Sequence, residues 1–169
     1  MQSVKAVNCL DSALADNLTS GYETIMSETK ENIKVLFLCT GNSCRSQIAE
    51  GWAEHLKGSV IDAYSAGIRP IGVSSRAIKV MAEAGVDISM HKSRHIDEFS
   101  QIDFDYVLTL CDNAAENCPV FNGKAKVIHR PFDDPYFASG SEEQIMATFR
   151  RVRDEIRAFV ETLPDSLKT

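Results

Sequence analysis

The chain has 169 residues and a formal net charge of −6, a length that fits one domain with a sizeable core. The acidic balance, without a run of basic residues, argues against a nucleic-acid partner. No segment approaches the roughly 18 apolar residues of a membrane span and no basic-then-apolar leader opens the chain, so we expect a cytoplasmic protein without a membrane partner.

Residues 1–32 precede the first apolar strand and are expected to form an N-terminal extension. This extension is either disordered or partly helical, with a short helix over Ser12 to Leu18. Met26 offers an alternative start of the protein, and the sequence leaves these possibilities open.

From residue 33 onward, apolar patterns with strand and helix periods alternate along the chain. They predict strands over 33–38, about 59–65, 105–110 and 126–130, and helices over 46–57, about 74–84 and about 142–162. Such alternation is typical of a parallel sheet covered by helices. We therefore predict an α/β fold, a single-domain four-stranded parallel sheet with helices on both faces, with a catalytic domain over 33–164 and a tail over 165–169.

The segment between the first strand and the first helix has the composition of an oxyanion-binding loop. It comprises Cys39, Thr40, Gly41, Asn42, Ser43, Cys44, Arg45 and Ser46. Gly41 allows unusual backbone angles, so successive amides and the helix N-terminus can form a nest for a tetrahedral oxyanion. Arg45 adds a planar, permanently charged fork that can bind two oxygens at once. A thiol at a helix N-terminus beside a cation can have a pKa of about 3.5–7.5, which makes Cys39 the expected nucleophile.

The alternative for Cys39 is an ordinary buried cysteine at a strand end, because free cysteines are among the most buried residues. The coincidence of strand, glycine, arginine and helix around it favours the nucleophile. Ser46 and Asn42 are expected to hydrogen-bond the thiolate or to hold the loop, and Cys44 to support it. No catalytic role is expected for Cys9.

A second pair of cysteines follows the third strand. Cys111 stands directly after this strand, and Cys118 lies seven positions later. If residues 112–117 were helical, the two cysteines would be about 10.5 Å apart along the axis. A disulfide needs Cα atoms roughly 4.4–6.8 Å apart. A disulfide between them therefore requires this polar segment to be a loop or to unravel, and Pro119 disfavours helix at its end.

Two other interpretations of this pair stay open at this point: two unreactive thiols, or half of a zinc site with His129. Zinc sites normally use four ligands at short paired spacings, so the wide spacing argues against a metal. His91 and His95 are expected in a solvated turn rather than on a metal ion. We therefore predict no metal and no cofactor.

The segment Asp133-Asp134-Pro135 follows the fourth strand and can supply a carboxylic acid. A placed general acid that protonates a departing oxygen contributes about 10²–10⁴-fold to a rate. Aspartates before a proline are also ordinary turn formers. Ligands of an open parallel sheet bind beyond the carboxyl ends of its strands, where all these segments lie, and this favours Asp134 as the acid.

Four motifs together resemble a known family. They are Cys39-Thr-Gly-Asn-Ser-Cys-Arg-Ser-Gln-Ile-Ala-Glu-Gly, Tyr64-Ser-Ala-Gly, Thr109-Leu-Cys with Cys118-Pro, and Phe132-Asp-Asp-Pro. Over residues 33 to about 162, the chain resembles the thioredoxin-coupled arsenate reductases, which are built on the low-molecular-weight tyrosine phosphatase fold. The phosphatases share the loop and the Asp-Pro pair but generally lack the second cysteine pair.

The resemblance implies a mechanism. Arsenate binds in the loop, Cys39 attacks arsenic and Asp134 protonates the departing oxygen. Cys111 then attacks Cys39 and releases arsenite, and Cys118 attacks Cys111 to leave a disulfide that thioredoxin reduces. Arsenic detoxification and a monomer are the corresponding expectations.

One departure from the family concerns potassium, which some members bind through positions that match Asn42, Glu50, Ser65 and an aspartate. Arg94 stands at the aspartate position. A guanidinium there would repel potassium and could itself pair with Glu50. We therefore expect no potassium requirement.

Two competing functions remain at the level of sequence. A low-molecular-weight tyrosine phosphatase would need only Cys39, Arg45 and Asp134, and the aromatic pair Tyr136-Phe137 is compatible with an aryl substrate. A non-enzymatic redox or zinc-binding module would need the cysteines without Arg45. The second cysteine pair favours the reductase.

Overall fold

The computed structural model describes residues 31–118 and 125–168. The predicted extension lies outside the described residues except for residues 31 and 32, so the Ser12–Leu18 helix and the Met26 start stay predictions. The elements are β1 (Ile33–Cys39), α1 (Arg45–Lys57), β2 (Ile61–Gly67), α2 (Ser75–Glu83), the 3₁₀ helix η1 (Ile96–Phe99), β3 (Tyr106–Thr109), α3 (Asp112–Glu116), β4 (Lys126–His129), η2 (Pro135–Phe137), α4 (Glu142–Glu161) and η3 (Asp165–Leu167).

The four strands form one sheet in the order β2-β1-β3-β4, and every neighbouring pair is parallel. The central strand β1 is buried on both faces, which its continuous apolar run requires. Successive side chains of a strand point to opposite faces, so Ser65 and Tyr64 of β2 lie on opposite faces of the sheet. Ser65 bonds Glu50 of α1, whereas the Tyr64 ring packs on Phe99 of η1.

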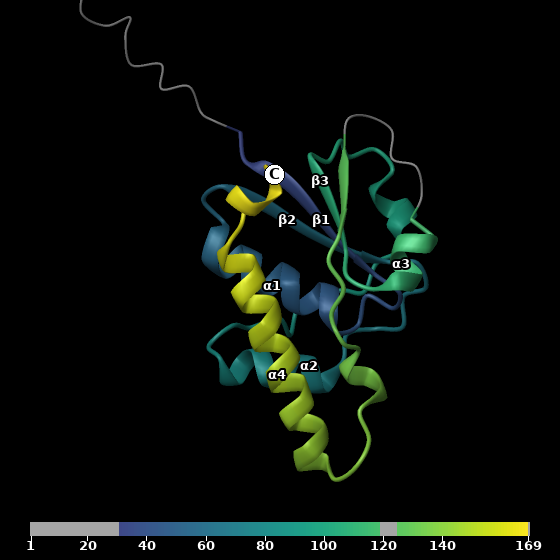
Figure 1. Cartoon of the computed structure of the whole chain (residues 1–169), viewed down its shortest axis with the longest axis vertical. Helices are drawn as coiled ribbons and strands as arrows, with labels where there is room; N and C mark the ends of the chain where they lie inside the picture. The colour runs from purple at the N-terminus through teal and green to yellow at the C-terminus, as the bar shows by residue number, and fades with distance from the viewer. Residues whose placement is uncertain (1–30, 119–124, 169) are drawn as a thin grey trace, which may run out of the picture. The chain divides into compact units, whose positions relative to one another are not determined.

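Helices α1, α2 and α4 pack together on one face, as Figure 1 shows, and Phe99 of η1 packs against Tyr64 on the other. The predicted four-stranded parallel sheet with helices on both faces is therefore confirmed. Helix α4 begins at a capping box in which Ser141 and Gln144 satisfy each other's backbone N–H groups. Among the described residues, no helix is both long enough and apolar enough to cross a membrane.

Two boundaries differ from the sequence-based expectation in an informative way. Strand β2 begins at Ile61 rather than near 59, because the Val60 N–H donates back to Lys57 O in a turn after α1. The expected tail over 165–169 contains η3, and its Leu167 is buried in the core with 1% of its surface exposed. The Leu167 side chain and the hydrogen bond from Lys126 Nζ to Leu167 O hold this segment on the domain.

Parallel strands bring their carboxyl ends to one edge of the sheet. Cys39 ends β1, and Cys111 lies two residues after the end of β3, where the N–H of the intervening Leu110 donates to Leu38 O of β1. The segment after β4 continues along the same edge, because the Phe132 N–H donates to Leu110 O. This edge therefore collects the three chemically reactive segments of the chain.

Candidate active site

The backbone of the loop after β1 is held by the segment after β2. The carbonyl oxygens of Cys39, Thr40, Gly41 and Ser43 accept hydrogen bonds from the N–H groups of Ile68, Arg69, Ile71 and Ser74, respectively. In a trans peptide, C=O and N–H point in opposite directions, so the loop N–H groups face away from that segment. The loop thus directs its donors toward one side, which is the arrangement an anion requires.

Asn42 determines the shape of this loop. Its backbone has a φ of 44°, a left-handed conformation that asparagine tolerates better than most residues. Its side-chain Oδ1 accepts from the Arg94 N–H at 2.7 Å and from Gln47 Nε2 at 3.0 Å. These two donors fix which end of the amide is oxygen. The Nδ2 group then donates to Ser46 Oγ at 2.9 Å and to Ser65 Oγ at 2.8 Å.

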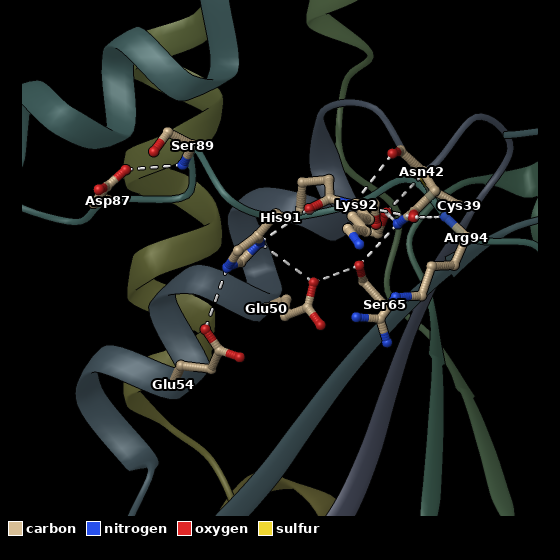
Figure 2. Close-up of polar contacts among 12 residues, drawn as sticks. Cys39, Asn42, Glu50, Glu54, Ser65, Asp87, Ser89, His91, Lys92 and Arg94 are labelled. Atoms are coloured by element: carbon tan, nitrogen blue, oxygen red, sulfur yellow. Dashed lines mark hydrogen bonds and ion pairs between the residues drawn. The ribbon is translucent and has the colours of Figure 1, made fainter. Parts of the chain in front are cut away.

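The direction of these hydrogen bonds decides what the nucleophile receives. The Ser65 hydroxyl donates to Glu50 Oε2 at 2.7 Å, so its oxygen is free to accept from Asn42. Ser46 Oγ also accepts from Asn42, which leaves its own hydrogen for Cys39 Sγ, 3.0 Å away. The series of hydrogen bonds through Glu50, Ser65, Asn42 and Ser46 therefore ends at the Ser46 hydroxyl, which points at Cys39 Sγ. Such a donor stabilises a thiolate (Figure 2 shows Asn42, Ser65 and Glu50).

Arg45, the first residue of α1, is buried and pairs with Asp134. Its Nη2 lies 2.5 Å from Asp134 Oδ2, and its Nη1 donates to Phe132 O at 3.2 Å. Asp134 also caps η2 by accepting from the Tyr136 N–H. Asp133 instead pairs with Arg151 of α4 on the exposed surface. Of the two aspartates, Asp134 is the one that reaches the loop.

Cys111 is buried beside the loop. Its Sγ lies 3.3 Å from Thr40 Oγ1, and the Thr40 hydroxyl donates to Asn113 Oδ1 at 3.2 Å. Because the single Thr40 hydrogen goes to Asn113, the Cys111 thiol is the donor to Thr40 in this arrangement. Cys118 is free and half-buried beyond α3, and burial raises the pKa of its thiol. The structure brings Cys39, Arg45, Cys111 and Asp134 together and leaves Cys118 apart.

A cavity of about 440 Å³ opens above the loop. It is lined by Cys39, Thr40, Gly41, Ser43, Cys44, Arg45, Arg69, Ile71, Asn113, Asp134, Tyr136 and Phe137. Sequence reasoning did not find Arg69, Ile71 or Asn113. The carboxyl-edge rule that identified Cys111 applies equally to the segment after β2, so it could have identified Arg69 and Ile71.

The positions that match the family's potassium site are engaged with protein groups. The Arg94 guanidinium packs over the Phe99 ring at 5.6 Å; among the described residues it forms no direct ion pair with Glu50, although its positive charge favours the ionised form of Glu50 and lowers the pKa of that carboxyl. His91 takes that place, with Nδ1 3.4 Å from Glu50 Oε2 and Nε2 3.3 Å from Glu54 (Figure 2). The expectation of a solvated turn is wrong for His91, whose side chain is only 15% exposed because Gln47 and both carboxylates surround it.

Burial raises the pKa of Glu50, and the hydrogen bond from Ser65 opposes this shift. The Asn42 oxygen already accepts two hydrogen bonds, and Ser65 donates to Glu50. The oxygens of Asn42 and Ser65 and one oxygen of Glu50 are thus hydrogen-bonded to protein groups. Within the described ranges, no group of three or more His, Cys, Asp and Glu residues is placed to hold a metal ion.

A parallel sheet that carries a Cys-to-Arg loop at its carboxyl edge defines a protein of the phosphatase-like class. The family model described as low molecular weight phosphotyrosine protein phosphatase matches residues 34–169. The chain belongs to this family.

The chain is 48% identical to an arsenate reductase of Halalkalibacterium halodurans, over 81% of this chain and 99% of that protein. It is also 48% identical to an arsenate reductase of Bacillus subtilis, over 78% and 98% of the respective chains. A solved structure of an arsenate reductase in its oxidized state superimposes with a TM-score of 0.64 at 34% identity, over 79% and 98%. A low molecular weight tyrosine phosphatase from T. tengcongensis does so with a TM-score of 0.64 at 26% identity, over 80% and 99%.

The close approach of Gly67 to the loop gives a test of the loop geometry. A Cβ at position 67 would lie 2.8 Å from Asn42 N and 2.9 Å from Thr40 O, so Gly67→Ala must displace the loop backbone. We expect the affinity for inorganic phosphate, measured by calorimetry, to fall about tenfold to hundredfold. Gly85→Ala is the control, because it strains a positive φ in open space away from the loop. Equal phosphate affinities in the two variants would contradict this geometry.

The buried thiol of Cys44 gives a second test. Burial raises its pKa to about 11, so at pH 8 about one molecule in a thousand carries the thiolate. We expect iodoacetamide to modify Cys39 well before Cys44 between pH 7 and 9, as followed by peptide mass spectrometry. In urea, where burial is lost, the two should react alike. Similar rates in the folded protein would show that Cys44 is not shielded.

Proposed function

We propose that this chain reduces arsenate to arsenite through a three-cysteine relay, that thioredoxin recycles the oxidised enzyme, and that this serves arsenic detoxification in the cytoplasm. One observation carries the proposal: Cys111 lies against the oxyanion loop through Thr40, with Cys118 one short helix away. A phosphatase has no use for a second thiol at that place. The named arsenate reductases among the relatives support the same function.

The first step uses the loop and Arg45. Arsenate binds to the loop N–H groups and draws the guanidinium away from Asp134, because a dianion competes for the same fork. The Asp134 carboxyl, released from the guanidinium, can then turn to the bound anion and act as the general acid. The Cys39 thiolate forms a bond to arsenic, and an As–O bond breaks as Asp134 delivers its proton to the departing water.

The second step reduces arsenic. The Cys111 thiolate attacks Cys39 Sγ, a disulfide forms, and the electron pair of the S–As bond stays on arsenic, which leaves as arsenite. For Cys111 to ionise, Thr40 must turn its hydroxyl hydrogen from Asn113 to the sulfur, since it now accepts from the thiol. Thr40 is therefore proposed to deliver the stabilising hydrogen bond in this step.

The third step frees Cys39. The Cys118 thiolate attacks Cys111, and the Cys39 thiolate leaves as the 111–118 disulfide forms. Helix α3 separates the two cysteines, so it must unwind first. Unwinding also removes Cys118 from the environment that raises its pKa, so the same motion that brings the thiol also activates it. An external dithiol protein, proposed to be thioredoxin, then supplies two electrons.

One observation favours a second activity. Tyr136 and Phe137 line the mouth of the cavity and are 58% and 79% exposed. Arsenate alone needs no aromatic contact, whereas an aryl phosphate does. We propose slow hydrolysis of aryl phosphates as a secondary activity that uses Cys39, Arg45 and Asp134 without the second cysteine pair.

Thiol titration distinguishes these activities. The fully reduced protein, mixed with arsenate in the absence of reductant, is expected to release one arsenite and to lose two thiols per chain. Cys111→Ser is expected to release no arsenite, because the attack on Cys39 is missing, whereas the matched control Cys9→Ser behaves as the wild type. Unchanged thiols together with hydrolysis of phenyl phosphate would instead make this chain a phosphatase.

We also propose that the reaction needs no metal and no potassium, because the oxygens of Asn42 and Ser65 and one oxygen of Glu50 are engaged with protein donors. Rates of arsenite formation in potassium and in sodium at equal ionic strength are expected to agree within about twofold. A several-fold increase specific to potassium would contradict the proposal.

A further inference from the structure

Among residues 31–118 and 125–168, the polar side-chain contacts of helix α3 with other elements lie at its first two residues. The Asp112 carboxylate contacts His129 Nε2 of β4 at 3.1 Å, and Asn113 accepts from Thr40 of the loop. Among the described residues, these are the polar side-chain contacts that join α3 to other elements, and both fall on its first two residues. The polar contacts of Asn117, at the other end, stay within the helix.

His129 is well placed to anchor this end. Its Nδ1 lies 2.9 Å from Thr109 Oγ1, which is fully buried on the neighbouring strand β3. An ionised Asp112 only accepts, so Nε2 carries a hydrogen and donates to it. In the neutral ring, Nδ1 then accepts from the Thr109 hydroxyl. The imidazole thus connects a rigid strand to the residue that directly follows Cys111.

We propose that His129 is a positioning residue that fixes the start of α3, so that Cys111 stays at the loop while the segment from Ala115 to Cys118 unwinds toward it. This inference rests on the proposed function, since it assigns the hinge of the third step. With the anchor at Asp112, the helix opens from its far end. The attacking sulfur of Cys118 moves, and the sulfur of Cys111 stays in place.

The anchor has a second consequence for the order of the steps. Cys111 must reach Cys39 before Cys118 reaches Cys111. A fixed start of α3 keeps Cys111 beside Thr40 throughout, whereas a helix free at both ends would carry Cys111 away from the loop. His129 does not line the cavity above the loop, and its side chain bonds Thr109 and Asp112, so its effect acts through Asp112.

The test compares His129→Ala, the conservative His129→Gln and the control His55→Ala, which removes an exposed histidine on α1. The full-length reduced protein is treated with iodoacetamide in saturating phosphate, and Cys111 modification is followed by mass spectrometry. Separately, arsenite release is measured in a single turnover, and phosphate affinity reports on the loop. The 39% and 84% exposure of the His129 and Asp112 side chains limits the expected effects to about twofold to fivefold.

We expect His129→Ala to speed Cys111 modification and to slow arsenite release by these factors, with phosphate affinity unchanged. His129→Gln can still donate to Asp112 and should recover part of both. In an Asp112→Ala background, His129→Ala should have little further effect, because the contact is already lost.

If Cys111 is modified at the same rate in His129→Ala as in the His55→Ala control, the proposed positioning role of His129 is overturned. A loss of phosphate affinity equal to the loss of arsenite release would also overturn it, because it would show damage to the whole edge of the sheet. If the wild type releases no arsenite, the proposed function fails and the hinge role fails with it. Cys111 modification is measured without arsenate, so its rates still test the contact between His129 and Asp112 independently of the proposed function.

Discussion

The conformation of Asn42 is the constraint on which the rest of the site depends. Its left-handed backbone turns the loop, and its amide joins four separate segments, α1, β2, the loop itself and the stretch before η1. Because two donors fix its oxygen, its nitrogen must donate to Ser46 and Ser65. The hydrogen that reaches Cys39 follows from this choice. A network buried to this degree is sensitive to any unsatisfied member, so the environment of Cys39 and the fold depend on the same contacts.

A second feature of the molecule is the contrast between the rigid carboxyl edge of the sheet and the short, weakly held helix α3. The loop, Arg45 and Cys111 are held by strands that lie buried in the core. Helix α3, with five residues, is far below the length at which an isolated helix is stable, and Ala114 is its one buried residue. A segment of low local stability can open without loss of the core. Under the proposed relay, the position of Cys118 beyond such a segment would let its sulfur move to Cys111 while the rest of the site stays packed.

The sequence predicted the reactive segments well, because strand periodicity and the rule of parallel carboxyl ends bring Cys39, Cys111 and Asp134 to one edge. It did not predict their connections. The contacts of Asn42 with Gln47, Ser65 and Arg94 depend on the register of separate elements, and His91 rather than Arg94 approaches Glu50 for the same reason. Whether residues 112–117 form a helix also lay beyond the sequence pattern, since tertiary packing of Ala114 decides it.

Disulfide mapping tests the central claim most directly. The reduced protein is oxidised with one equivalent of arsenate, the remaining thiols are blocked, and the linked peptides are identified by mass spectrometry. The account gives a Cys111–Cys118 disulfide in the wild type and a Cys39–Cys111 disulfide in Cys118→Ser, the trapped form of the preceding step. A disulfide between any other pair, or arsenite without a disulfide, would contradict it.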